Sequence, residues 1–270
     1  MEEVKSLLDE LEQAKEVWLK DRGVFLLKLK SVSSRLANCV ETASQDEVPG
    51  ILEVVMGKGE DSSSNILSFA TDLAKDQQKE RSKDGGDLLQ HVAELLGSLQ
   101  QKHPKLVRPQ LARLLKLAKA LFFCHPTAKV RIRGLILVET CVTAPSPGRK
   151  DQEQLAKDLA VESLASQLHN ALATRLQPSV LAKLRCVLGV TVRSFPEHFQ
   201  LLQLDLRNSF IREMDRAMAA TTANLDLTLA EGTLDGLNAL LTAFPFEDGE
   251  EEGKGQLYEL LRKLCRFVLI

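Results

Sequence analysis

Cys124 and His125 are adjacent in this sequence, and their side chains are the ones that most readily suggest chemistry. A thiol beside an imidazole could act as a nucleophile with its base, and both groups bind metal ions. Adjacent residues on a helix do not face each other, however. No two of the five histidines stand four positions apart, the spacing that places two metal ligands on one helix face. We therefore interpret Cys124 as a core residue that ends a helix and His125 as a turn residue, and we expect no catalytic residue, no metal and no cofactor.

Two further enzyme motifs are incomplete or missing. The segment Gly57-Lys-Gly-Glu-Asp lacks the glycine spacing and the preceding strand of a phosphate-binding loop, and the sequence contains no Gly-x-Ser-x-Gly motif. These observations favour a protein that is not an enzyme. An all-α enzyme or a carrier of small molecules is the alternative, and it requires a deep pocket with convergent polar groups.

The charge of the segment from Leu95 to Val138 is more informative, because it holds nine basic and no acidic residues. A local field of this sign attracts an acidic peptide or a phosphate backbone, even though the whole chain has a formal net charge of −2. Arg113, Lys116 and Lys119 recur at every third position, which predicts a slanting stripe on a helix. We predict a partner-binding surface made of Arg108, Arg113, Lys116, Lys119, Lys129 and Arg133.

Three interpretations of this basic segment are open. The first is a protein partner that contributes an acidic peptide or helix. The second is nucleic acid, although no aromatic residues alternate with the charges to stack bases. The third has no partner: the charges form a solvated helix face, and Arg131 makes internal bonds to a neighbouring turn.

The pattern of apolar residues predicts an all-α fold. Aromatic residues make up 4% of the chain, and apolar residues recur at steps of three or four, as in the series Phe25, Leu29, Val32, Leu36. Leu and Ala favour helices, whereas strands prefer β-branched and aromatic residues. We predict helices over 4–20, 23–43, 46–56, 65–86, 87–103, 109–123, 128–142, 153–176, 178–195, 196–221, 228–244 and 256–270.

The two helices on either side of His125-Pro126 resemble a HEAT repeat. The unit is PQLARLLKLAKALFFCHPTAKVRIRGLILVETCV, residues 109–142, in which Pro126 lies in the turn and Val130-Arg131 opens the second helix. Gly134 stands near a position where the family usually has a small Ala. The resemblance is weaker over 154–195. It implies antiparallel helical pairs stacked as a HEAT/armadillo-like solenoid, and a compact multi-helix bundle is the alternative.

The stretch Thr-Ala-Pro-Ser-Pro-Gly-Arg-Lys-Asp-Gln is the clearest linker in the sequence. We expect N-terminal helical repeats over 1–143, a linker over 144–153 and C-terminal repeats over 154–270. The two sets of repeats are expected to form one continuous solenoid.

The remaining features indicate an intracellular protein without a membrane span. Five unpaired cysteines indicate reduced thiols, and no apolar run reaches the ~20 residues that cross a bilayer. The acidic run from Glu247 to Glu252 is expected to be a loop. The apolar end Leu-Cys-Arg-Phe-Val-Leu-Ile is expected to pack, to dock a partner or to continue into a longer chain. These features favour a non-enzymatic scaffold or adaptor, a subunit of a larger complex in the cytoplasm or the nucleus.

Overall fold

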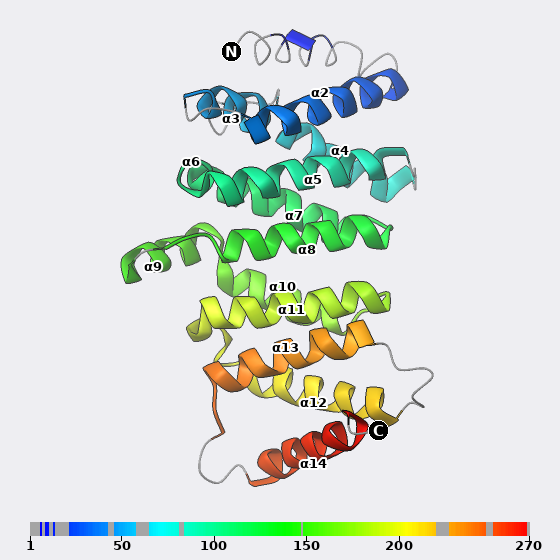
Figure 1. Cartoon of the computed structure of the whole chain (residues 1–270), viewed down its shortest axis with the longest axis vertical. Coiled ribbons are helices and arrows are strands. Elements are labelled where there is room, and N and C mark those ends of the chain that lie inside the picture. The colour runs from blue at the N-terminus through cyan, green and yellow to red at the C-terminus, as the bar shows by residue number, and fades with distance from the viewer. Residues whose placement is uncertain are drawn as a thin grey trace. The chain divides into compact units, whose positions relative to one another are not determined.

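The computed structural model describes most of the chain, and every element in the described part is a helix (Figure 1). The all-α prediction is therefore confirmed. The chain divides into two compact units, Met1–Pro147 and Gly148–Ile270, and each is considered by itself. The described residues are Ser6, Asp9, Glu10, Gln13 and the ranges 22–42, 46–57, 65–80, 84–146, 148–219, 227–246 and 251–268.

The helices of the first unit pack in two rows. Helices α2, α5 and α8 lie side by side in one row, and α4 and α7 lie side by side in the other (Figure 1). The rows are joined where α4 packs on α5 and α7 packs on α8. Such stacking of helical pairs buries one face of each helix against its partner and another against the next pair. The elements are α2 (Arg22–Thr42), α3 (Val48–Met56), α4 (Ile66–Glu80), α5 (Asp84–Lys102), α6 (Pro104–Val107), η1 (Arg108–Gln110), α7 (Leu111–Cys124) and α8 (Ala128–Val142).

The predicted turn at His125-Pro126 is present. Helix α7 ends at Cys124, and the next residue, His125, has an extended backbone (ψ 138°). Proline disfavours the helical conformation of the residue before it, so the helix stops there. Thr127 is also extended, and α8 begins at Ala128. The resemblance to a HEAT repeat thus placed both helices and the break between them.

Gly134 marks the closest approach of α7 and α8. A Cβ atom at this position would lie 2.7 Å from the Ala118 carbonyl oxygen, 2.8 Å from the Phe122 nitrogen and 2.9 Å from the Leu121 Cβ. Real side chains do not come this close to a backbone. The glycine lowers helix propensity by about 1 kcal/mol, and in return the two helices pack backbone to backbone.

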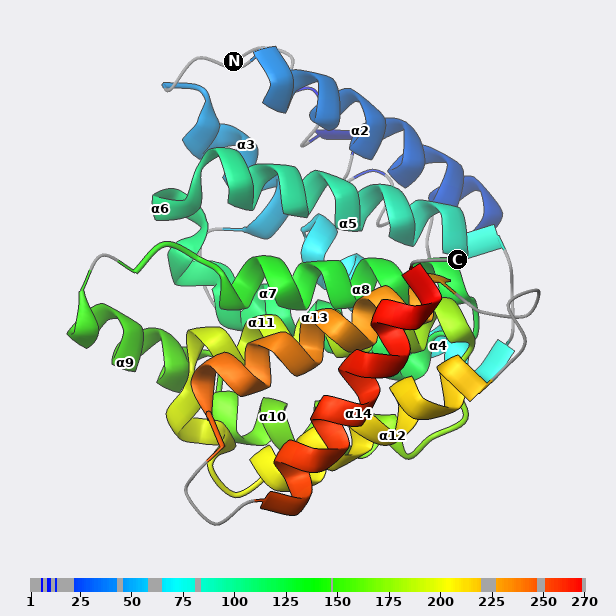
Figure 2. The same ribbon diagram turned by 60° about the horizontal axis from the view of Figure 1, so that its bottom comes forward.

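The second unit is built around the pair α11 and α13. Gly189 of α11 and Gly236 of α13 face each other, since a Cβ on Gly189 would lie 2.9 Å from the Gly236 Cα. Helix α12 packs on α13, and α14 packs on α12 (Figure 2). The elements are α9 (Arg149–Asp158), α10 (Val161–Leu172), α11 (Pro178–Ser194), η2 (Pro196–Phe199), α12 (Gln203–Ala219), α13 (Leu227–Ala243) and α14 (Glu251–Val268).

Several predicted boundaries in this unit need correction. The stretch 153–176 is two helices rather than one, because Ala160 adopts a left-handed conformation (φ 46°) between α9 and α10. The stretch 144–153 is helical from Arg149 onward, so the linker is shorter than expected. The stretch 196–221 begins with the short helix η2, and α12 follows from Gln203.

Two predicted features near the C-terminus lie partly outside the described residues. Residues 247–250 of the acidic run are outside, and α14 already begins at Glu251 rather than at Gln256. The backbone of the apolar end is helical as far as Val268, while its side chains lie outside the described part. Docking at this end and a continuous solenoid stay predictions.

Candidate partner-binding groove

His125 is a buried turn residue. Its side chain is 2% exposed, and its Nδ1 accepts a hydrogen bond from the Thr127 backbone N–H at 3.1 Å. Burial lowers the pKa of the imidazole, so the neutral form, which can accept this bond, is favoured. The histidine therefore stabilises the turn between α7 and α8. In the part of the chain that the structure describes, no three His, Cys, Asp or Glu side chains lie close enough together to hold a metal ion.

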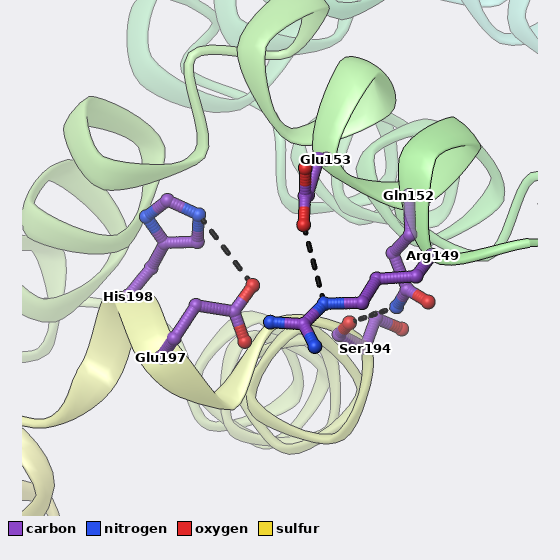
Figure 3. A network of polar contacts seen from close by, with 6 residues as sticks. All are labelled: Arg149, Gln152, Glu153, Ser194, Glu197 and His198. Atoms are coloured by element: carbon purple, nitrogen blue, oxygen red, sulfur yellow. Dashed lines mark hydrogen bonds and ion pairs between the residues drawn. The ribbon is translucent and has the colours of Figure 1, made fainter.

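A second polar cluster lies in the second unit, between α9 and η2 (Figure 3). The Gln152 amide donates to the Ser194 carbonyl oxygen, and Arg149 pairs with Glu153 at 3.2 Å. His198 and Glu197 of η2 are 3.7 Å apart. The Arg149 side chain is 93% exposed, and the cluster contains no thiol or other strong nucleophile. It ties α9 to the C-terminal end of α11.

Three arginines of the basic segment make contacts within the first unit. Arg131 donates from Nε to the Phe122 carbonyl oxygen at 2.9 Å, and its guanidinium lies 5.2 Å from the centre of the Phe122 ring. Arg133 pairs with Glu94 of α5 at 2.5 Å. Arg108 donates to the Pro145 carbonyl oxygen at 3.0 Å. The internal bond expected for Arg131 is confirmed.

Arg113 joins three helices of the first unit. Its Nη1 donates to the carbonyl oxygen of Met56, the last residue of α3, at 2.6 Å and to the Gln110 Oε1 at 3.0 Å. Its Nη2 donates to the Ser68 hydroxyl of α4 at 3.3 Å. These three acceptors hold the guanidinium in one orientation at the N-terminal end of α7.

The same guanidinium forms one wall of an open groove between α4 and α7. The groove has a volume of about 370 Å³. Three of its side chains are cationic and one is anionic, so its net charge is positive. Lys75 and Asp72 lie 3.9 Å apart on one wall, and Lys116 is exposed on the other. The lining residues are Leu67, Ser68, Thr71, Asp72, Lys75, Arg113 and Lys116.

The structure separates the predicted stripe. Lys116 is exposed and lines the groove, whereas Lys119 is half-buried and burial lowers its pKa. Lys129 is exposed in the first turn of α8. Of the six residues predicted for a partner-binding surface, only Arg113 and Lys116 therefore line the groove.

The α4 side of the groove was missed by the sequence reasoning. Lys75, Asp72 and Ser68 lie some forty residues before Arg113, in a segment whose polar end was read as exposed or frayed. No local pattern connects them to α7. The packing of α4 against α7 brings the two sets of side chains together.

Comparison with known families matches residues 86–266, two thirds of the chain, to the family described as DNA-PKcs, N-terminal. The chain belongs to this family. The DNA-PKcs N-terminal domain is a HEAT-type helical region of a large kinase, and the kinase activity lies in another region. The HEAT-like unit at 109–142 and the two rows of helices agree with this membership. The matched residues include α7 of the groove but not α4. A comparison with curated proteins gives no match.

No described helix of this DNA-PKcs N-terminal family member combines the length and the apolar character that crossing a membrane requires.

Proposed function

We propose that the chain is a non-enzymatic helical scaffold, part of a larger intracellular assembly, and that its α4–α7 groove docks an acidic segment of a protein partner. Membership of the DNA-PKcs N-terminal family supports the scaffold role, because that region is helical and the kinase activity lies elsewhere. Surfaces of stacked helical pairs commonly bind peptides and helices in this way.

The groove itself carries the proposal. Arg113 is already oriented by three acceptors, so a carboxylate that approaches it finds a donor whose conformation is preorganised. Lys75 and Lys116 stand on opposite walls, where they can pair with acidic side chains of one bound segment. Charge-assisted hydrogen bonds are about twice as strong as neutral ones. Leu67 adds apolar surface at the bottom of the groove.

A small-molecule carrier fits this groove less well. Pockets for small molecules are mostly apolar and enclose most of the ligand. This groove is open and its lining is mainly polar or charged, with Leu67 as its one aliphatic lining residue. Its shape and composition suit a few side chains of a larger partner better than a whole small ligand.

Nucleic acid is the second candidate, and one observation favours it. The segment from Leu95 to Val138 contains nine basic and no acidic residues, and the family's printed name includes DNA. However, Arg108, Arg131 and Arg133 already bond within the unit, and Arg133 is neutralised by Glu94. Arginine is the residue best suited to bidentate phosphate contacts, so these engagements favour the protein partner.

The test compares two charge reversals in the full chain. Lys75→Glu with Lys116→Glu reverses both walls of the groove. Lys28→Glu with Lys30→Glu, on exposed positions of α2, changes the net charge equally and leaves the groove intact. Partners captured from a cell lysate are identified by quantitative mass spectrometry, and the Kd of each purified candidate is then measured with all three proteins.

We expect the groove variant to weaken binding of the true partner about tenfold or more. Each charge-assisted hydrogen bond is worth roughly 1.5–3 kcal/mol, and about 1.4 kcal/mol corresponds to a factor of ten. The α2 variant should bind almost as the wild type does. Equal weakening by both variants would show that only the overall charge matters, and the groove would be rejected.

A short DNA duplex separates the two candidates. Fluorescence anisotropy at physiological salt should detect no binding to the wild-type chain if the partner is a protein. Binding that falls steeply with salt and is lost in the groove variant would favour the nucleic-acid candidate instead.

A further inference from the structure

The segment after α8 presents a serine outside any helix. Thr143 forms the end of α8, and residues 144–146 have no regular secondary structure. Ala144 is buried, whereas Pro145 is exposed. Ser146 is half-buried, and its hydroxyl donates to the Ala144 carbonyl oxygen at 3.3 Å. One weak local bond therefore holds this hydroxyl.

The residues that follow Ser146 have a pattern that a protein kinase can read. Of the nine prolines in the chain, only Pro147 directly follows a Ser or Thr. Arg149 and Lys150 come three and four positions after the serine, and both are exposed. Proline-directed kinases require a proline directly after the acceptor, and many of them favour a basic residue three positions after it.

We propose that Ser146 is a phosphorylation site for a proline-directed Ser/Thr kinase. The kinase transfers the γ-phosphoryl group of ATP to the serine Oγ. The new O–P bond forms as the bond between the γ-phosphorus and the bridging oxygen of the β-phosphate breaks. ADP is the leaving group, and the hydroxyl proton passes to the catalytic base of the kinase.

Arg108 is placed to receive the phosphate. Its Nη1 lies 3.0 Å from the carbonyl oxygen of Pro145, the residue directly before the serine. Standard backbone dimensions put this oxygen within roughly 5 Å of the Ser146 Oγ. A phosphate on that atom extends toward the guanidinium and can form charge-assisted hydrogen bonds with it. The modification would thus join η1 to the segment after α8 more firmly, and both belong to the first unit.

Access by a kinase disturbs little of the structure. Kinases bind the acceptor segment in an extended form, so Arg149 and Lys150 would have to leave the first turn of α9. The N–H groups of a first helical turn have no partner inside the helix. The main bond lost is the one from the Gln152 N–H to the Gly148 carbonyl oxygen, at 3.0 Å.

Phosphorylation of the full chain with ATP and a purified proline-directed kinase tests the site. We expect one phosphate per chain, located on Ser146 by tandem mass spectrometry. Ser146→Ala and Pro147→Ala should abolish incorporation, and Arg149→Gln should slow it severalfold. Arg175→Gln changes an exposed arginine outside the motif and should have no effect. Absence of phosphate on Ser146 in the folded wild-type chain would overturn the proposal.

Phosphorus-31 NMR tests the role of Arg108 separately. A free phosphoserine has a second pKa of about 6, and pairing with a guanidinium lowers the pKa of the phosphate. We expect a lower value in the phosphorylated wild type than in the phosphorylated Arg108→Gln variant, with unchanged circular dichroism. Equal values in the two proteins would overturn the assignment of Arg108 as the receiving residue. Neither measurement depends on the α4–α7 groove.

Discussion

Gly134 and Ala118 hold α8 and α7 in backbone contact: a Cβ atom at Gly134 would lie 2.7 Å from the Ala118 carbonyl oxygen. Each of the three atoms nearest to this point belongs to α7, and two of them are backbone atoms that cannot rotate away. The pair of helices on which the rest of the first unit stacks therefore depends on the absence of a side chain at one position.

Gly134→Ala should destabilise the first unit by about 1–2 kcal/mol. Overpacking a tight contact costs about 1–3 kcal/mol, while the gain in helix propensity returns up to about 1 kcal/mol. Gly97→Ala is the matched control, because a Cβ there would meet the Leu137 Cδ2 at an ordinary 3.9 Å. That variant should be more stable by about 0.5–1 kcal/mol. Urea unfolding followed by circular dichroism measures both, and two changes of the same sign would contradict the argument.

Glu213→Gln should destabilise the second unit by about 2 kcal/mol. Arg185 is 3% exposed, its Nη2 lies 3.4 Å from the Glu213 carboxylate, and its Nη1 donates to the Thr233 hydroxyl at 2.6 Å. Burial lowers the pKa of Arg185, and the carboxylate opposes this effect. Removing the carboxylate charge leaves a buried cation poorly compensated, a change that costs several kcal/mol when both partners are fully buried. The estimate is lower here because the Glu213 side chain is 26% exposed.

The control for this pair is Glu259→Gln on α14. Glu259 and Arg262 lie 3.3 Å apart, but both side chains are about half exposed. An exposed pair of this kind contributes roughly 0–1 kcal/mol. Thermal unfolding should therefore separate the two variants clearly, and an equal loss of stability in both would show that burial of Arg185 does not matter.

His125 should make the folded state less stable as the pH falls below about 6.5, the ordinary pKa of histidine. Burial lowers the pKa of His125 in the folded protein. The unfolded chain then binds more protons than the folded chain between the two pKa values, so the free energy of unfolding rises with pH in that window. The contribution is fully present above the unfolded pKa and is lost as the pH falls through the lower folded pKa.

Urea unfolding between pH 5 and 8 isolates this contribution when wild type is compared with His125→Gln. The other four histidines are present in both proteins, so their effects cancel in the difference. The wild type should lose more stability on acidification than the variant. A parallel pH dependence of the two proteins would contradict the prediction.

Cys141 should resist alkylation in the folded protein. Its side chain is buried, and burial raises the pKa of the thiol to about 12. Near pH 8 its thiolate fraction is then roughly a thousandfold smaller than that of an ordinary thiol. Iodoacetamide labelling with mass spectrometry should modify the half-buried Cys39, Cys124 and Cys186 first. Cys141 should react only after unfolding, and early labelling of this residue would contradict its burial.

Much of the local structure could be predicted, because its causes are local. The α7–turn–α8 unit follows from apolar periodicity interrupted by His125-Pro126, and proline ends a helix whatever surrounds it. The break at Ala160 could not be predicted in this way. Alanine favours helices, and a left-handed alanine between two helical patterns leaves no signal in composition or spacing.

For the candidate site, the sequence by itself determined that basic residues gather between Leu95 and Val138 and lie on helices. Only the tertiary structure decided which of them bond internally and which line a groove. The partners of Arg108, Arg113 and Arg133 lie between 37 and 57 residues away for the first two, and on another helix for the third. Lys75 joins the groove for the same reason, since α4 packs on α7. Periodicity tells which face of a helix is apolar, but the contacts of its polar face depend on the helices that pack beside it.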